Sequence, residues 1–115
     1  MAALQHIEPV SIADLGNGVH IIGIGDFFGL YANNENEPLL PARFDNMLTR
    51  PGKPELWYFK ATFVGIYHYT ERRVLVPGGR FCSIFHTINP EVYLVYDKNN
   101  KEGHYNSTLK KYITV

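Results

Sequence analysis

The second half of the sequence is built from short runs of β-branched and aromatic residues that are separated by turn signals. These runs cover residues 55–69, 73–76, 80–88, 91–97 and 109–115. Such runs, bounded by glycine, proline and asparagine, are typical of β-strands. Short turns between consecutive strands favour antiparallel pairing. This half therefore predicts a curved antiparallel sheet or a small barrel.

Glycines indicate where this sheet bends. Pro77-Gly78-Gly79 separates two of the runs and predicts a hairpin between residues 73–76 and 80–88. Gly65 lies inside the longest run, where a bulge or bend would relieve a long flat ribbon. Residues 80–88 are apolar on both faces of the predicted strand, which indicates a central strand of a sandwich or a strand in a subunit interface.

The first half carries weaker signals. Asn17-Gly18 predicts a turn, and the apolar run 19–24 predicts a strand after it. Residues 41–49 predict one helix, because Pro41 suits a first helical position and the apolar side chains recur at spacings of three and four. Residues 11–14 predict at most one helical turn.

Length and composition place these elements in one globular fold. The chain has 115 residues, of which 45% are hydrophobic and 19% charged, so bulk disorder is excluded. It shows no internal repeat and no low-complexity tract. We therefore expect one domain over residues 1–115. Its fold class is mainly β (α+β), a curved antiparallel sheet or small barrel of five or six strands with one short helix packed on it.

Charge, cysteine content and hydropathy limit the classes of partner and the compartment that are expected for this chain. The 11 Lys and Arg residues balance 11 Asp and Glu residues, which argues against binding to extended nucleic acid. No stretch approaches the roughly 20 apolar residues that cross a bilayer, and residues 1–10 lack a signal-peptide pattern. With one cysteine, Cys82, the chain forms no internal disulfide. These features predict a cytoplasmic protein without a membrane partner.

One group of arginines and aromatic residues stands out as a candidate ligand site. A guanidinium group grips phosphate oxygens while an aromatic ring stacks on a base, so the combination suits an anionic, nucleotide-like molecule. If residues 73–80 form a hairpin, Arg73 and Arg80 could converge. The alternative is that these charges keep a sheet edge soluble. The predicted ligand-binding residues are Arg72, Arg73, Arg80, Tyr67, Tyr69, Phe81 and His86.

Catalytic and metal signals are weaker. Cys82 and His86 are four residues apart on a predicted strand, roughly 13 Å along one face, which is too far for a nucleophile and its base. The five histidines show no local metal-ligand spacing. The sequence therefore predicts no cofactor and no metal.

Three functions remain, in decreasing order of support. The first is a non-catalytic binding module that self-associates and holds an anionic small ligand near residues 72–80. The second is a protein-binding inhibitor or adaptor that uses a tyrosine-rich surface. The third is a small enzyme that uses His68, Cys82 or His86.

Overall fold

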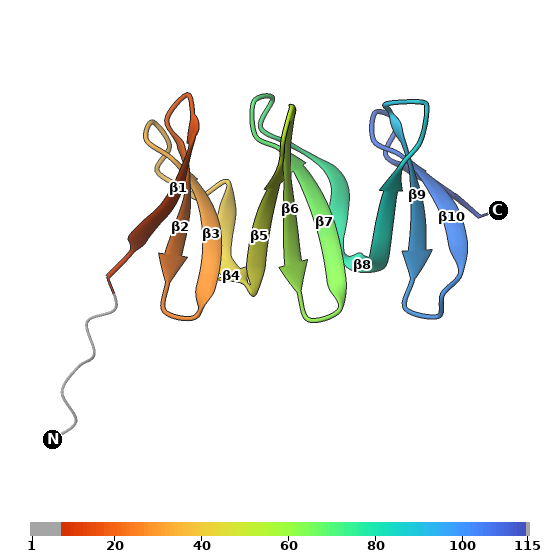
Figure 1. The fold of residues 1–115 in the computed structure, drawn as a ribbon, viewed down its shortest axis with the longest axis horizontal. Coiled ribbons are helices and arrows are strands. Elements are labelled where there is room, and N and C mark those ends of the chain that lie inside the picture. The colour runs from red at the N-terminus through yellow and green to blue at the C-terminus, as the bar shows by residue number, and fades with distance from the viewer. Residues whose placement is uncertain (1–7, 115) are drawn as a thin grey trace, which may run out of the picture. The chain divides into compact units, whose positions relative to one another are not determined.

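The computed structural model describes residues 8–114, which form strands and turns and contain no helix. Eleven strands are arranged in two antiparallel sheets (Figure 1). The chain divides into two compact units, residues 1–45 and residues 46–115, and each unit holds one sheet. The prediction of a mainly β fold with antiparallel sheets is confirmed, whereas neither sheet closes into a barrel.

The first unit is a four-stranded meander in which each strand pairs with the next along the chain. The apolar residues 19–24 form its second strand, as their β-branched composition predicts. Val19, Ile21 and Leu30 are among its buried side chains. The strands are β1 (Val10–Gly16), β2 (Val19–Ile24), β3 (Phe27–Ala32) and β4 (Leu40–Phe44).

The second unit is a seven-stranded meander in which the spatial order again follows the chain. Its core contains aliphatic and aromatic side chains from β7 through β10. The strands are β5 (Asn46–Arg50), β6 (Lys53–Lys60), β7 (Phe63–His68), β8 (Arg73–His86), β9 (Val92–Asp97), β10 (Glu102–Asn106) and β11 (Lys111–Thr114).

The predicted helix at residues 41–49 is wrong. Those residues form β4 and β5, which belong to different sheets. Leu40 and Phe44 pair with Leu30 and Phe28 of β3, so cross-strand pairing overrides the local helical spacing. Pro41 lies in the outermost strand of its sheet, where proline is tolerated. Residues 11–14 likewise lie in β1 and do not form a helical turn.

The predicted long strand at residues 55–69 is instead a hairpin. Strands β6 and β7 pair through Lys60 and Phe63, and Ala61 in the turn between them adopts a left-handed φ of 54°. Alanine rarely adopts this conformation, so its sequence gives no turn signal. The predicted irregularity at Gly65 is present, because the register of β7 against β8 shifts between Val64 and Ile66.

The predicted hairpin around residues 77–79 is also wrong. β8 is one continuous strand, and it pairs with β7 mainly through residues 73–76 and with β9 through residues 81–86. Gly79, at a φ of 79°, lies between these two stretches. The Pro-Gly-Gly segment therefore bends a strand from one neighbour to the next and does not reverse it.

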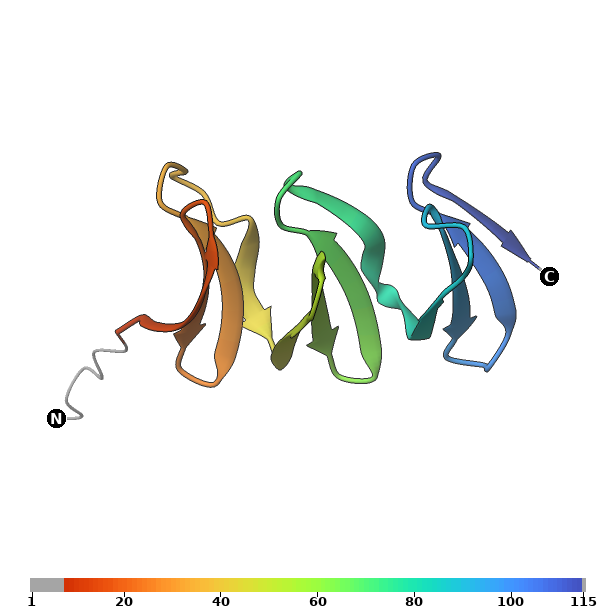
Figure 2. The same cartoon turned by 45° about the horizontal axis from the view of Figure 1, so that its top comes forward.

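The pairing registers reveal an internal repeat that the sequence alone did not show. Three hairpins, β2–β3, β6–β7 and β9–β10, each place a Gly-X-Tyr triplet at the same point of their second strand. The triplets are residues 29–31, 65–67 and 103–105. In all three hairpins the glycine and the tyrosine are each paired with a residue of the preceding strand, and the pairing register is the same in the three hairpins. The three ribbons have the same form in Figures 1 and 2.

Each repeat also has a strand before its hairpin and a strand after it. The first repeat is β1 to β4, the second is β5 to β7 with residues 73–76 of β8, and the third is residues 81–86 of β8 with β9 to β11. Cross-strand partners point to the same side of a sheet, so each repeat has two defined faces.

We call the side that carries the Gly-X-Tyr tyrosine the tyrosine face, and the other side the aliphatic face. On the aliphatic face, three cross-strand partners form one row in each repeat. The rows are Ile21, Leu30 and Leu40 in the first repeat, Trp57, Ile66 and Val76 in the second, and Leu94, His104 and Ile113 in the third.

The core of the second unit lies between the two repeats that form it. Ile66 and Val76 from the aliphatic face of the second repeat share one buried cluster with Tyr93, Val95 and Tyr105 from the tyrosine face of the third. Burial of this apolar surface is the main stabilising contribution to the unit. The two repeats are thus joined by a contact in which the tyrosine face of the third repeat covers the aliphatic face of the second.

Candidate functional site

The seven predicted ligand residues lie in separate places. Tyr67 and Phe81 are buried in the sheet, at 4% and 1% exposure. Tyr69 follows β7 and donates its backbone N–H to the carbonyl of Pro54. Arg72 occupies the turn before β8 at a left-handed φ of 56°.

Arg73 and Arg80 do not converge. They are seven residues apart on one strand, which corresponds to roughly 20 Å along β8. The Arg73 guanidinium is 2.7 Å from the Glu71 carboxylate and donates to the carbonyl of Ser107. The cavity beside it, about 230 Å³, is lined by Glu55 and Glu91 together with Lys53 and His68. Arg73 is therefore already paired with a carboxylate, and its surroundings carry charges of both signs.

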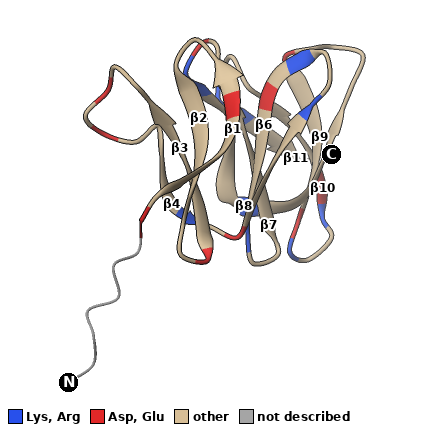
Figure 3. Cartoon of the chain, turned by 60° about the vertical axis from the view of Figure 1, so that its left-hand side comes forward, with Lys and Arg blue, Asp and Glu red and all other residues tan. Residues whose placement is uncertain are grey.

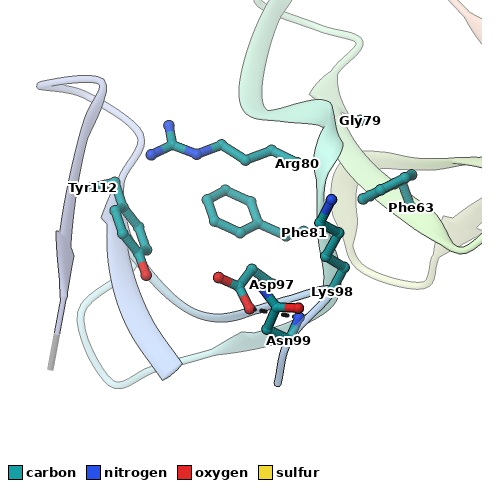
Figure 4. A pocket seen from close by; sticks show the side chains of 8 residues that line it. All are labelled: Phe63, Gly79, Arg80, Phe81, Asp97, Lys98, Asn99 and Tyr112. Carbon is teal, nitrogen blue, oxygen red and sulfur yellow. Dashed lines mark hydrogen bonds between the residues drawn. The ribbon is translucent and has the colours of Figure 1, made fainter. Parts of the chain in front are cut away.

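Arg80 lies in a second cavity of about 320 Å³, within the size range of small-molecule sites. Strand β8 supplies Gly79, Arg80 and Phe81, and the end of β9 with the loop after it supplies a charged wall (Figure 4). Phe63 and Tyr112 complete the lining from β7 and β11. Of the predicted residues, the structure brings together Arg80 and Phe81.

Two aromatic rings hold the Arg80 guanidinium. Its central carbon lies 4.7 Å from the centre of the Tyr112 ring and 5.1 Å from that of Phe81. These are cation–π distances, and the side chain extends across the rings toward Tyr112 in Figure 4. Stacking in this way leaves the N–H groups at the edge of the guanidinium plane able to donate.

The charges around this cavity are mixed, with an excess of cations. Arg80 and Lys98 line it together with one carboxylate, Asp97. Asp97 Oδ1 accepts the backbone N–H groups of Asn99 and Lys101 at 2.9 Å, which shapes the loop after β9. The acidic side chain is thus engaged in a turn, whereas Lys98 is exposed.

A glycine supports the ring on which Arg80 stacks. A Cβ atom at Gly103 would lie 2.6 Å from Tyr112 Cζ, so the ring packs directly against the β10 backbone. Tyr112 also lies 5.6 Å from the Phe81 ring. The two aromatic residues and the glycine form a fixed platform under the guanidinium.

A buried carboxylate marks a second polar cluster, at Glu55 near the start of β6. Glu55 is 6% exposed and has three side-chain partners. Trp57 Nε1 donates to Oε1 at 3.2 Å, the Tyr93 hydroxyl donates to Oε2 at 2.9 Å, and His86 Nε2 lies 2.8 Å from Oε1. His86, a predicted ligand residue, is therefore a partner of Glu55. The cluster joins the second repeat to the third.

Opposing effects act on the pKa of Glu55. Burial raises it, whereas the hydrogen bonds from Tyr93, His86 and Trp57 lower it and prevail, so the pKa of Glu55 lies below 4.5. Burial and the hydrogen bond to Glu55 raise the pKa of Tyr93, which keeps its hydroxyl protonated as a donor. The cluster is thus an ionised carboxylate surrounded by donors.

We expect the stability of the fold to depend on Glu55 at acid pH. Because the folded-state pKa of Glu55 is lowered, its carboxylate stabilises the protein above pH 4.5, and this stabilisation is lost as the pH falls through the folded pKa. The free energy of unfolding, measured by urea denaturation at a series of pH values, should fall in that window. Glu55→Gln should flatten the fall, and an equally steep fall in that variant would contradict the assignment.

The catalytic candidates do not form a nucleophile with its base. Cys82 Sγ lies 4.0 Å from the hydroxyl of Thr62, and His86 faces Glu55 four residues farther along β8. His68 accepts the N–H of Glu71 through Nδ1. Among residues 8–114, no three His, Cys, Asp or Glu side chains gather as they would around a metal ion.

Sequence reasoning missed Tyr112, Lys98 and Glu55. Tyr112 reaches the Arg80 cavity from β11 and Lys98 from the loop after β9, so both are far from Arg80 in the sequence and no local pattern links them to it. Glu55 had a usable signal, because it is an acidic residue at the start of a run rich in apolar residues. Charges of both signs are interspersed along loops and strand ends in the view of Figure 3.

No protein-family model matches this chain, and no curated protein matches it either. The described part of the chain also has no helix that is long and apolar enough to cross a membrane.

Proposed function

We propose that this protein is a non-catalytic binding module and that its Arg80 cavity holds a small anionic ligand with a planar, nucleotide-like group. The observation that carries the proposal is the Arg80 guanidinium, stacked on Phe81 and Tyr112 in a cavity that also receives Lys98. Two cations suit charged oxygens, and the aromatic wall suits a planar ring.

Arg80 supports this role better than Arg73 does. Arg73 has a carboxylate partner at 2.7 Å, whereas the Arg80 guanidinium lies over the rings of Phe81 and Tyr112. An anion that binds Arg80 would gain charge-assisted hydrogen bonds without first displacing a carboxylate from it. The cavity lies in the second unit alone, so the site needs residues 46–115 only.

Arg80→Ala is expected to weaken the binding of ADP, used as a probe that combines a base with charged oxygens. Loss of charge-assisted hydrogen bonds of about 1.5 kcal/mol corresponds to an affinity about tenfold lower. Isothermal titration calorimetry measures the change. Adenosine and inorganic diphosphate, titrated separately, should each bind more weakly than ADP.

Arg73→Ala is the matched control, because it removes the same side chain from the same strand outside the cavity. It should bind ADP as the wild type does. Equal affinity in Arg80→Ala and the wild type, or a loss confined to Arg73→Ala, would refute the proposed site. Thermal unfolding of both variants checks that each remains folded.

Recognition of a protein partner is a second candidate function. It is favoured by large apolar side chains that remain exposed on the third repeat, including Phe85 and Ile113. Both lie on its aliphatic face, since Phe85 pairs with Leu94 and Ile113 pairs with His104. A pull-down in which Phe85→Ser and Ile113→Ser lose a partner that Arg80→Ala retains would support this function.

A further inference from the structure

The third repeat leaves uncovered a face that is covered in the second. Ile66 and Val76, from the row on the aliphatic face of the second repeat, are both 0% exposed. The equivalent residues of the third repeat are His104, which is exposed, and Ile113, which is 63% exposed. A shallow cavity of about 380 Å³ runs beside them. The row on the aliphatic face is thus buried in the core in the second repeat and exposed at the surface in the third.

The first repeat shows the reverse pattern on its tyrosine face. In the second and third repeats, the residues that pair with the Gly-X-Tyr glycine and tyrosine are buried, among them Leu56, Tyr58 and Val95. In the first repeat the equivalent residues are Ile22 and His20, and both are half-buried. Tyr31, the tyrosine of its triplet, is also only half-buried.

We propose that the aliphatic face of the third repeat binds the tyrosine face of the first repeat in a second copy of this chain. We choose a tyrosine face as the binding partner because the second unit already contains this contact: the aliphatic face of its second repeat is covered by the tyrosine face of the third. Val95 and Tyr105 make that contact, and the first repeat carries Ile22 and Tyr31 in the same register. The arrangement is independent of the ligand proposed for Arg80.

Such an association joins two different surfaces and is therefore head-to-tail. Each added copy again presents an exposed aliphatic face and a partly exposed tyrosine face, so assembly does not stop at a dimer unless the rotation closes a ring. Two copies that met through the same face would instead form a closed dimer. The two possibilities predict different behaviour for variants of each face.

The test is sedimentation velocity of the full chain over a wide concentration range, with a lysine placed on each face. Ile113→Lys blocks the aliphatic face of the third repeat, and Ile22→Lys blocks the tyrosine face of the first. The wild type should grow beyond a dimer as concentration rises, and each variant alone should remain a monomer. An equimolar mixture of the two should form a dimer and nothing larger, because one intact face of each kind remains.

Ile88→Lys is the control, because Ile88 is fully exposed in the turn after β8 and belongs to neither face. It should assemble as the wild type does. If Ile22→Lys fails to fold, as judged by thermal unfolding, His20→Lys takes its place on the same face. A wild type that stays monomeric over the whole concentration range overturns the proposal. Dimers that Ile113→Lys abolishes and the mixture does not restore would also overturn it, in favour of like-face pairing.

Discussion

Replacing Glu55 with alanine is expected to lower the free energy of unfolding by about 2–3 kcal/mol, because three donors would lose their shared acceptor. Trp57, His86 and Tyr93 all direct polar atoms at the Glu55 carboxylate. Removing one partner of a buried polar cluster leaves the others desolvated and unpaired, which costs more than the net strength of each bond. Urea denaturation at neutral pH measures the loss.

Glu71→Ala provides the comparison. Glu71 is an exposed carboxylate that makes an ion pair with Arg73 at 2.7 Å, and solvent screening leaves exposed pairs only a small contribution to stability, so its loss should be much milder. Glu55→Gln keeps the shape of the side chain and one acceptor, so its loss should fall between the two. If Glu55→Ala proved as mild as Glu71→Ala, the cluster would not join the second and third repeats as described.

Gly65→Ala is expected to destabilise the second unit by about 2 kcal/mol through overpacking. A Cβ atom at this position would lie 2.6 Å from the hydroxyl oxygen of Tyr58. The ring cannot retreat, because Gly78 approaches it from β8 and a Cβ there would lie 2.6 Å from Tyr58 Cε2. Thermal unfolding should show the loss as a lower Tm.

A double variant isolates the cause. Tyr58→Leu removes the ring that the new methyl group meets, so Gly65→Ala should cost less in that background than in the wild type. Gly23→Ala serves as the tolerated control, since its nearest neighbour is the end of the Ile12 side chain at 3.3 Å. Equal costs of Gly65→Ala in both backgrounds would show that the clash is not with Tyr58.

The sequence predicted strands where composition and alternation agree and failed where pairing overrides local signals. The predicted strands at residues 19–24 and 91–97 are present as β2 and as β9, which begins at Val92, as their β-branched residues indicate. Residues 41–49 match a helix by spacing, yet their strands find partners in β3 and β6 that no local pattern can show. The turn at Ala61 was missed because its conformation is set by the two strands that it joins.

The repeat was missed because only two residues, the glycine and the tyrosine of the triplet, are shared by all three copies of it. Gly65 and Gly103 each lie against a tyrosine ring, whereas a Cβ at Gly29 would lie 2.8 Å from the backbone of Ala42. Each repeat needs a glycine at this position because another group packs closely against it. The group that packs there differs between the repeats, so few residues around the glycine are identical. The predicted ligand residues lie apart because Pro77-Gly78-Gly79 bends β8, whereas the sequence predicted a reversal of the chain that would bring Arg73 and Arg80 together.

The continuity of β8 has a consequence for how the second unit can come apart. One strand donates hydrogen bonds to β7 at one end and to β9 at the other, so the second and third repeats have no connecting loop between them. In an array of repeats, stability is approximately the sum of the stability of each repeat and of its interfaces with its neighbours, so one repeat can unfold while its neighbour remains folded. Here, fraying of either repeat would have to break a strand that both share. The two repeats therefore form one cooperative unit, and partial unfolding that exposes their common core is disfavoured.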